Sequence, residues 1–199
     1  MNHQISRIRL ISLTLGVFLL STVLVTGPLV AASDPEKTFL FNKLTKAQTE
    51  QEGQLAEEAI WRYWMNQSPT PEVRTALDAG MERREAYDYE AAEKHFDEVI
   101  ALAPDYAEGY NQRAFIRFLR ENYGGAESDL EKALSLEPEH FGAMAGLYQV
   151  LLRQDRQQVA LRMLQQAVAI HPWLKERFGL PETMWPKSYR DLHDPDQEI

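Results

Sequence analysis

The side chains best suited to acid–base or metal chemistry in this chain are its histidines. They are His3, His95, His140, His171 and His193. No two of them have the i, i+4 spacing with which two histidines on one helix bind zinc. His140 and His171 lie next to prolines between predicted helices, where a histidine most often caps a helix end. A small hydrolase that uses His140 or His171 with a nearby carboxylate is therefore a hypothesis, but a structural role is favoured.

Other catalytic signatures are missing from the sequence. The 199 residues contain no cysteine, which excludes disulfides, thiolate metal sites and a cysteine nucleophile. No glycine-rich phosphate loop, G-x-S-x-G turn or dinucleotide fingerprint occurs. The formal net charge of −9 argues against a nucleic-acid partner, since neutralising phosphates requires a basic surface. We therefore expect a protein that is not an enzyme and that uses no cofactor or metal.

The first 32 residues have the pattern of a secretory signal peptide. Arg7 and Arg9 precede an almost wholly apolar stretch at 10–25, and a Gly-Pro break and small residues ending at Ala32 follow it. Cleavage after Ala32 would give a periplasmic or secreted protein. The apolar stretch is also close to the length that spans a bilayer, so an uncleaved anchor in the inner membrane is the alternative, and only then would the protein contact a membrane.

A repeat of 34 residues dominates the remainder. Pro104, Pro138 and Pro172 are spaced by 34, and each follows an amphipathic segment. Twelve residues before each proline stands an alanine, and eight before stands a large apolar residue. These positions are Ala92, Ala126 and Ala160, then Phe96, Leu130 and Leu164. Such a period predicts three stacked pairs of helices, because a pair this small cannot bury its apolar face alone.

The A-x3-F pattern followed by proline, at Ala92, Phe96 and Pro104, resembles the tetratricopeptide repeat (TPR) family. The segment from Pro138 through His140, Phe141 and Gly142 resembles exported TPR proteins of alphaproteobacteria. The resemblance implies an all-α, right-handed solenoid of three helical hairpins with flanking N- and C-terminal helices. The expected organisation is a signal peptide at 1–32, an N-terminal capping region at 33–72, repeats at 73–106, 107–140 and 141–174, and a C-terminal cap and disordered tail at 175–199.

The flanking segments give less specific predictions. Residues 36–67 indicate a helix that weakens or breaks at Gly53. Trp61, Tyr63 and Trp64 in this segment are expected to cover an exposed apolar end of the solenoid rather than to form a binding site. The charged stretch from Tyr189 onward has no periodicity and is expected to be disordered.

The family resemblance also implies where a partner would bind, in a concave groove lined by the first helix of each pair. By repeat position the lining residues would be Leu77, Met81, Arg84, Asn111, Phe115, Phe118, Ala145, Gln149 and Leu152. This apolar and aromatic lining suits a peptide or a partner helix. The chain's own N-terminal helix filling the groove is an equally supported alternative. The sequence thus predicts an exported scaffold or adaptor whose protein or peptide partner it does not identify.

Within the third repeat, Gly142 and Gly146 lie one turn apart on a predicted helix. A glycine inside a helix costs about 1 kcal/mol relative to alanine, so a packing or binding reason is expected. Close approach of a neighbouring element is favoured over space for a ligand backbone.

Overall fold

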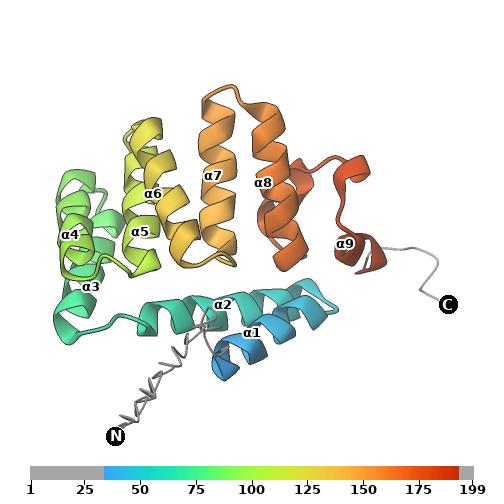
Figure 1. The fold of residues 1–199 in the computed structure, drawn as a ribbon, viewed down its shortest axis with the longest axis horizontal. Helices are drawn as coiled ribbons and strands as arrows, with labels where there is room; N and C mark the ends of the chain where they lie inside the picture. The colour runs from blue at the N-terminus through green and yellow to red at the C-terminus, as the bar shows by residue number, and fades with distance from the viewer. Residues whose placement is uncertain (1–33, 193–199) are drawn as a thin grey trace, which may run out of the picture. The chain divides into compact units, whose positions relative to one another are not determined.

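The computed structural model describes residues 34–192, which belong to one compact unit, Ser33–Ile199. The predicted signal peptide, His3 and the last seven residues with His193 lie outside the described residues. Within 34–192 the chain is helical and contains no strand (Figure 1). The helices are α1 (Pro35–Lys46), α2 (Glu50–Asn66), α3 (Pro71–Glu85), α4 (Tyr89–Leu102), α5 (Ala107–Leu119), α6 (Tyr123–Leu136), α7 (Phe141–Arg153), α8 (Gln157–Ile170) and α9 (Lys187–Leu192), with short 3-10 helices η1 (Lys175–Gly179) and η2 (Glu182–Met184).

Helices α3 to α8 form three antiparallel hairpins stacked side by side (Figure 1). The repeated alanines Ala92, Ala126 and Ala160 are all fully buried, as equivalent positions of a repeat should be. Gly80 shows why small residues stand at these crossings, because a Cβ there would lie 2.5 Å from Phe96 Cε1. The predicted fold class, three helical hairpins with flanking helices, is confirmed.

The turn within each hairpin uses the same backbone conformation. Tyr87, Glu121 and Asp155 are spaced by 34 and have φ values of 59°, 60° and 58°. This left-handed region costs a residue other than glycine about 1–2 kcal/mol. The next residue caps the following helix in two of the three turns, where Asp88 and Asn122 accept a backbone N–H through their side chains.

The N-terminal segment is a helical hairpin rather than one helix weakened at Gly53. The break lies at residues 47–49, and Gly53 is a buried position inside α2. Thr49 accepts the N–H of Glu52, and Glu52 Oε2 accepts the N–H of Gln48, which is a capping arrangement that starts a new helix. A Cβ at Gly53 would lie 2.5 Å from Trp173, so this glycine permits a close contact.

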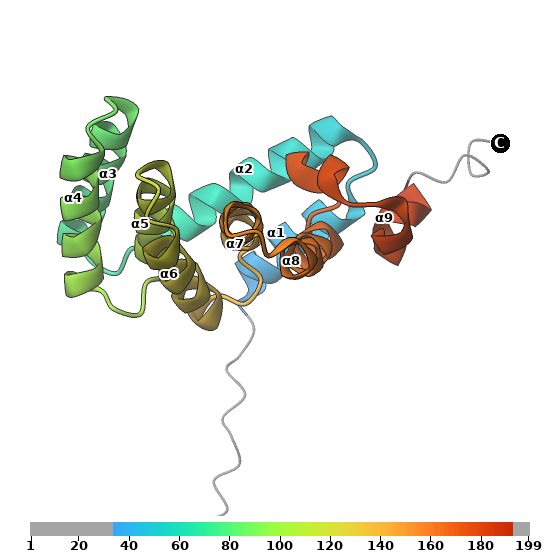
Figure 2. The same cartoon turned by 90° about the horizontal axis from the view of Figure 1, so that it is seen from above.

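Helix α2 lies across one end of the repeat helices (Figures 1 and 2). The Tyr106 hydroxyl, from the turn between α4 and α5, donates to the Trp64 carbonyl at 3.0 Å. The His140 ring, from the turn between α6 and α7, stacks on Trp64 with centroids 4.0 Å apart. The His171 ring, at the end of α8, lies with Nε2 3.1 Å from Glu57 Oε2. One helix therefore contacts the turn that follows each of the three hairpins.

The segment after α8 is more ordered than its composition suggests. Tyr189 on α9 is buried and packs edge-on against Trp185. The expectation of disorder from Tyr189 onward is therefore wrong for its first four residues, while the rest lies outside the described region. In residues 34–192, none of the helices has both the length and the apolar character needed to cross a membrane.

Candidate functional site

A cavity of about 290 Å³ lies on the face formed by the first helices of the hairpins; we call it the groove. Phe115 and Phe118 of α5 contribute aromatic surface to it; Phe115 is 47% exposed, and Phe118 is partly buried against the core. Asn111 and Gln149 also line it. A groove lined by aromatic and hydrogen-bonding side chains can hold an apolar segment and satisfy its backbone.

The structure brings six of the nine predicted lining residues together around the groove. They are Arg84, Asn111, Phe115, Phe118, Ala145 and Gln149. The other three do not line it: Leu77 is fully buried, Met81 packs against the core of the first hairpin, and Leu152 packs against the main core. These three positions differ from expectation because their side chains are part of, or pack against, the hydrophobic cores instead of the groove.

Helix α2 forms a wall of the groove instead of filling it. Trp61 and Glu57 both line the cavity, and Trp61 packs edge-on against Phe141 with centroids 5.9 Å apart. Gly142 allows the Trp61 ring to pack at this position, because a Cβ on residue 142 would lie only 2.5 Å from the indole. At Gly146 the close neighbour is Leu130, whose Cδ2 would lie 3.1 Å from a Cβ on residue 146. Close packing, rather than space for a ligand backbone, accounts for both glycines.

A chain of hydrogen bonds runs from the groove into the interior. Arg84 Nη1 donates to Gln112 Oε1 at 2.7 Å, and Gln112 Nε2 donates to Glu108 Oε1 at 2.5 Å. Glu108, which is 1% exposed, also accepts from His140 Nε2 at 3.0 Å. Buried polar groups need such partners, so this chain holds the Arg84 guanidinium in place over the Phe115 ring at 5.7 Å.

The opposite part of the groove is lined by two carboxylates from outside the hairpins. Glu57 belongs to α2, and Glu176 belongs to η1. The hydrogen bond with His171 lowers the pKa of Glu57 below its ordinary value, and Trp61 Nε1 also donates to this carboxylate at 3.3 Å. Sequence reasoning missed both carboxylates because the repeat pattern does not extend to their segments.

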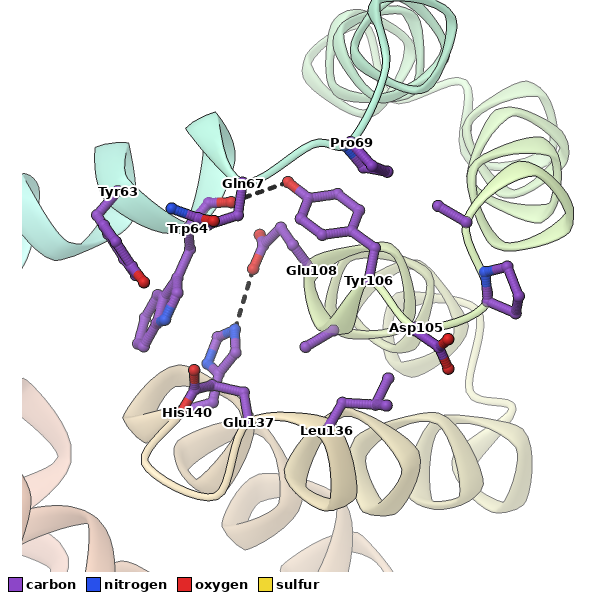
Figure 3. Close-up of a pocket in the computed structure, with 13 residues that line it drawn as sticks. Tyr63, Trp64, Gln67, Pro69, Asp105, Tyr106, Glu108, Leu136, Glu137 and His140 are labelled. Atoms are coloured by element: carbon purple, nitrogen blue, oxygen red, sulfur yellow. Dashed lines mark hydrogen bonds and ion pairs between the residues drawn. The ribbon is translucent and has the colours of Figure 1, made fainter. Parts of the chain in front are cut away.

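A second cavity of about 470 Å³ lies between α2 and the turns that precede α5 and α7; we call it the edge cavity (Figure 3). Trp64, Tyr106, Glu108 and His140 line it. In Figure 3 dashed lines mark the hydrogen bond between Glu108 and His140 and the one that the Tyr106 hydroxyl donates to the Trp64 carbonyl. His140 Nδ1 accepts the N–H of Ala143 at 3.1 Å, so Nε2 carries the proton given to Glu108. His140 is therefore a helix cap, as its position predicted.

The hydrolase hypothesis requires a histidine that is free to act as a base beside a nucleophile, and His140 in the edge cavity does not meet this requirement. Both nitrogens of His140 are engaged and its ring is fully buried. The lining of the edge cavity contains no serine, threonine or lysine that a histidine base could activate. Residues 34–192 also hold no group of three histidine, aspartate or glutamate side chains arranged for a metal ion. No observation on this cavity favours catalysis.

Three hairpins stacked in one direction, with a groove on the face of their first helices, define a helical-repeat solenoid of the protein-binding type. No family model matches the chain. A TPR repeat-containing protein of Rhizobium etli is 30% identical over 183 residues, which is 84% of this chain and 89% of that protein. The tetratricopeptide repeat protein 36 homolog of Nematostella vectensis is 42% identical over 66 residues, 33% of this chain and 36% of that protein.

Solved structures share the fold. The Arabidopsis OM64 TPR domain has a TM-score of 0.53 at 17% identity and covers 64% of this chain and 96% of that chain. The first TPR domain of Spaghetti (RPAP3), bound to an HSP90 peptide, has a TM-score of 0.53 at 14% identity and covers 64% of this chain and 94% of that chain. With the Rhizobium relative, these results show that this chain belongs to the tetratricopeptide repeat family.

Proposed function

We propose that the protein is an exported, non-catalytic scaffold that binds an extended peptide or a partner helix in the groove. The observation that carries this proposal is Phe115, which is 47% exposed in the groove, with the partly buried Phe118 and with Gln149 lining the cavity beside it. Aromatic side chains on a rigid helix lose little conformational entropy when they bind, so they are effective contact residues. The TPR domain of Spaghetti, which is bound to an HSP90 peptide, supports a peptide-binding role by analogy.

The groove assignment can be tested with a phage-displayed library of random peptides selected on the purified protein. We expect the selected peptides to lose at least about tenfold in affinity for the double variant Phe115→Ala, Phe118→Ala, since each removes a contact aromatic. Phe39→Ala is the matched control, because Phe39 is 57% exposed on α1 and does not line the groove. Helical circular dichroism should stay unchanged in both variants. Equal binding to the double variant would refute the assignment.

Export is a separate part of the proposal and rests on the signal-like pattern of residues 1–32. Mass spectrometry of the native N-terminus decides between the two forms. A mature chain that begins at Ser33 supports cleavage and release, and an intact N-terminus in the membrane fraction supports the anchored form.

A further inference from the structure

Two arginines pack over the two aromatic side chains that α5 contributes to the groove. The Arg84 guanidinium carbon lies 5.7 Å from the centre of the Phe115 ring, and that of Arg153 lies 5.8 Å from the centre of the Phe118 ring. Arg84 belongs to α3 and Arg153 to α7, which are the first helices of the hairpins on either side of α5 (Figure 1). Each aromatic ring of the groove therefore has a cation beside it, one from each neighbouring hairpin.

Neither of these arginines has an acidic partner in the described part of the chain. No carboxylate there forms an ion pair with Arg84 or Arg153, and the hydrogen bond of Arg84 goes to the neutral amide of Gln112. The adjacent Arg83, in contrast, has an ion-pair partner in Asp88. The sequence contains 30 acidic and 21 basic residues, so a shortage of carboxylates does not explain two unpaired cations beside one groove.

Both guanidinium groups can be reached by a bound chain. Arg84 is half-buried and lines the groove, and Arg153 is exposed at the end of α7. The bond to Gln112 uses Nη1 of Arg84, so Nε and Nη2 remain available as donors. Gln112 in turn donates to the buried Glu108, which holds Arg84 in place before a ligand binds. A side chain that is already held in its binding position loses little conformational entropy when it binds.

The chemistry of these donors selects carboxylates. A guanidinium has N–H groups in a planar fork that matches the two oxygens of a carboxylate, and it can pack on an aromatic ring at the same time. The ring beside it provides contact surface for an apolar side chain. Two guanidinium groups from different hairpins need two carboxylates, and a chain has only one C-terminal carboxylate. At least one of the two must therefore belong to an aspartate or glutamate side chain.

We propose that Arg84 and Arg153 bind acidic side chains of the segment in the groove, with an apolar residue between them packed on Phe115 and Phe118. This proposal rests on the groove being the binding site. The carboxylates that α2 and η1 contribute to the groove repel an acidic residue at that end, which places the acidic residues of the partner over α3 and α7. The partner is thus a protein segment in which acidic residues flank an apolar one, and it need not end in the groove.

The test repeats the phage selection on the wild-type protein, Arg84→Gln and Arg84→Glu. We expect wild type to select aspartate or glutamate on both sides of an apolar residue, and Arg84→Gln to lose the enrichment on one side. Arg84→Glu should select lysine or arginine there, a reversal that a loss of structure would not produce. Arg83→Gln is the matched control, because Arg83 lies in the same last turn of α3, pairs with Asp88 and does not line the groove.

A selected peptide with an amidated C-terminus and its variant with glutamine in place of the acidic residue complete a double-mutant cycle. The acidic side chain should contribute about tenfold in affinity to wild type, the size of a hydrogen bond between charged groups, and little to Arg84→Gln. Arg153→Gln should remove the dependence on the second acidic position in the same way. Helical circular dichroism of each variant should match wild type.

The outcomes separate this proposal from the one on which it rests. Selected peptides that depend on Phe115 and Phe118 but show no acidic preference would overturn the role of the arginines and leave the groove function intact. The same conclusion follows if the preference persists in both Arg84→Gln and Arg153→Gln, or if amidation of the C-terminus abolishes binding. If no selected peptide depends on Phe115 and Phe118, both proposals are overturned.

Discussion

Gly142 on α7 and Trp61 on α2 are in direct contact, so closely that a Cβ on residue 142 would lie 2.5 Å from the Trp61 ring. The same indole lines the groove and donates to Glu57. The absence of a side chain at residue 142 therefore determines the position of a groove wall that comes from outside the repeats.

Substituting Gly142 by alanine should lower stability and shift Trp61. Alanine improves helix propensity by about 1 kcal/mol, but overpacking against a rigid indole costs about 1–3 kcal/mol. Urea unfolding followed by tryptophan fluorescence measures the balance. Gly124→Ala is the control, because nothing lies within 4 Å of a Cβ at that helical position. We expect it to stabilise the protein, and a Gly142→Ala variant that is equally stabilised would contradict the packing explanation.

Glu121→Gly should stabilise the protein, against the usual effect of glycine. Glu121 has a φ of 60°, a conformation that glycine adopts without the steric cost of a Cβ. Part of the gain is offset by the greater entropy of glycine in the unfolded chain, so the net effect should be about 0.5–1 kcal/mol. Thermal unfolding measures it. Glu131→Gly, in the middle of α6, is the control and should destabilise by about 1 kcal/mol.

Asp129→Ala should be strongly destabilising. Asp129 is 3% exposed and accepts hydrogen bonds from Arg113 and Arg117 at 2.6–2.9 Å. Removing this buried carboxylate leaves Arg113 with Asp97 alone and Arg117 with Glu93 alone. Breaking a buried ion pair costs about 3–5 kcal/mol, and these remaining partners place the expected loss near the lower end. Asp97→Ala provides the comparison, because Asp97 contacts the same Arg113 from a half-exposed position, where a pair is worth about 1 kcal/mol or less. Equal losses in chemical denaturation would argue against a special role for Asp129.

Glu57→Gln should make the stability of the protein fall less steeply with decreasing pH in acid. The hydrogen bond with His171 lowers the pKa of Glu57 in the folded protein from the ordinary value of 4.5. The unfolded state therefore takes up this proton first, and the stabilisation is lost as the pH falls below about 4.5 through the lowered value. Denaturation midpoints measured across that range should fall less steeply in Glu57→Gln than in wild type. The matched variant Glu58→Gln, at an exposed position on the same helix, should keep the wild-type slope.

The repeated part of the fold was predictable because its signal is periodic. Pro104, Pro138 and Pro172, with the buried alanines twelve residues earlier, were sufficient to predict three hairpins. The break between α1 and α2 also had a local signal, the capping pair of Thr49 and Glu52, in which Thr49 lies four residues before Gly53. A glycine in a helix need not mark a break, because it can also permit close contact with a neighbouring side chain. Gly53 does so, since a Cβ there would clash with Trp173.

The groove was only partly predictable, for a related reason. Repeat position identified Phe115, Phe118 and Arg84, since equivalent residues of a solenoid face the same way. Glu57 and Glu176 enter the groove from α2 and η1, and no rule of local sequence indicates where a flanking segment packs. Their placement depends on long-range contacts, such as the one between Glu57 and His171, which are 114 residues apart.

Helix α2 also has a consequence for how the chain unfolds. In an open repeat array each unit touches only its neighbours, so the ends fray first. Here Trp64 contacts Tyr106 and His140, and Glu57 contacts His171. Helix α2 therefore connects the turn after the first hairpin with the turns after the second and third. The array should then melt in a single cooperative transition, with amide protons of α3 and α8 exchanging as slowly as those of α5. Folding should also be slower than in a solenoid without such a helix, because the long chain segment between Glu57 and His171 must close into a loop before their contact can form.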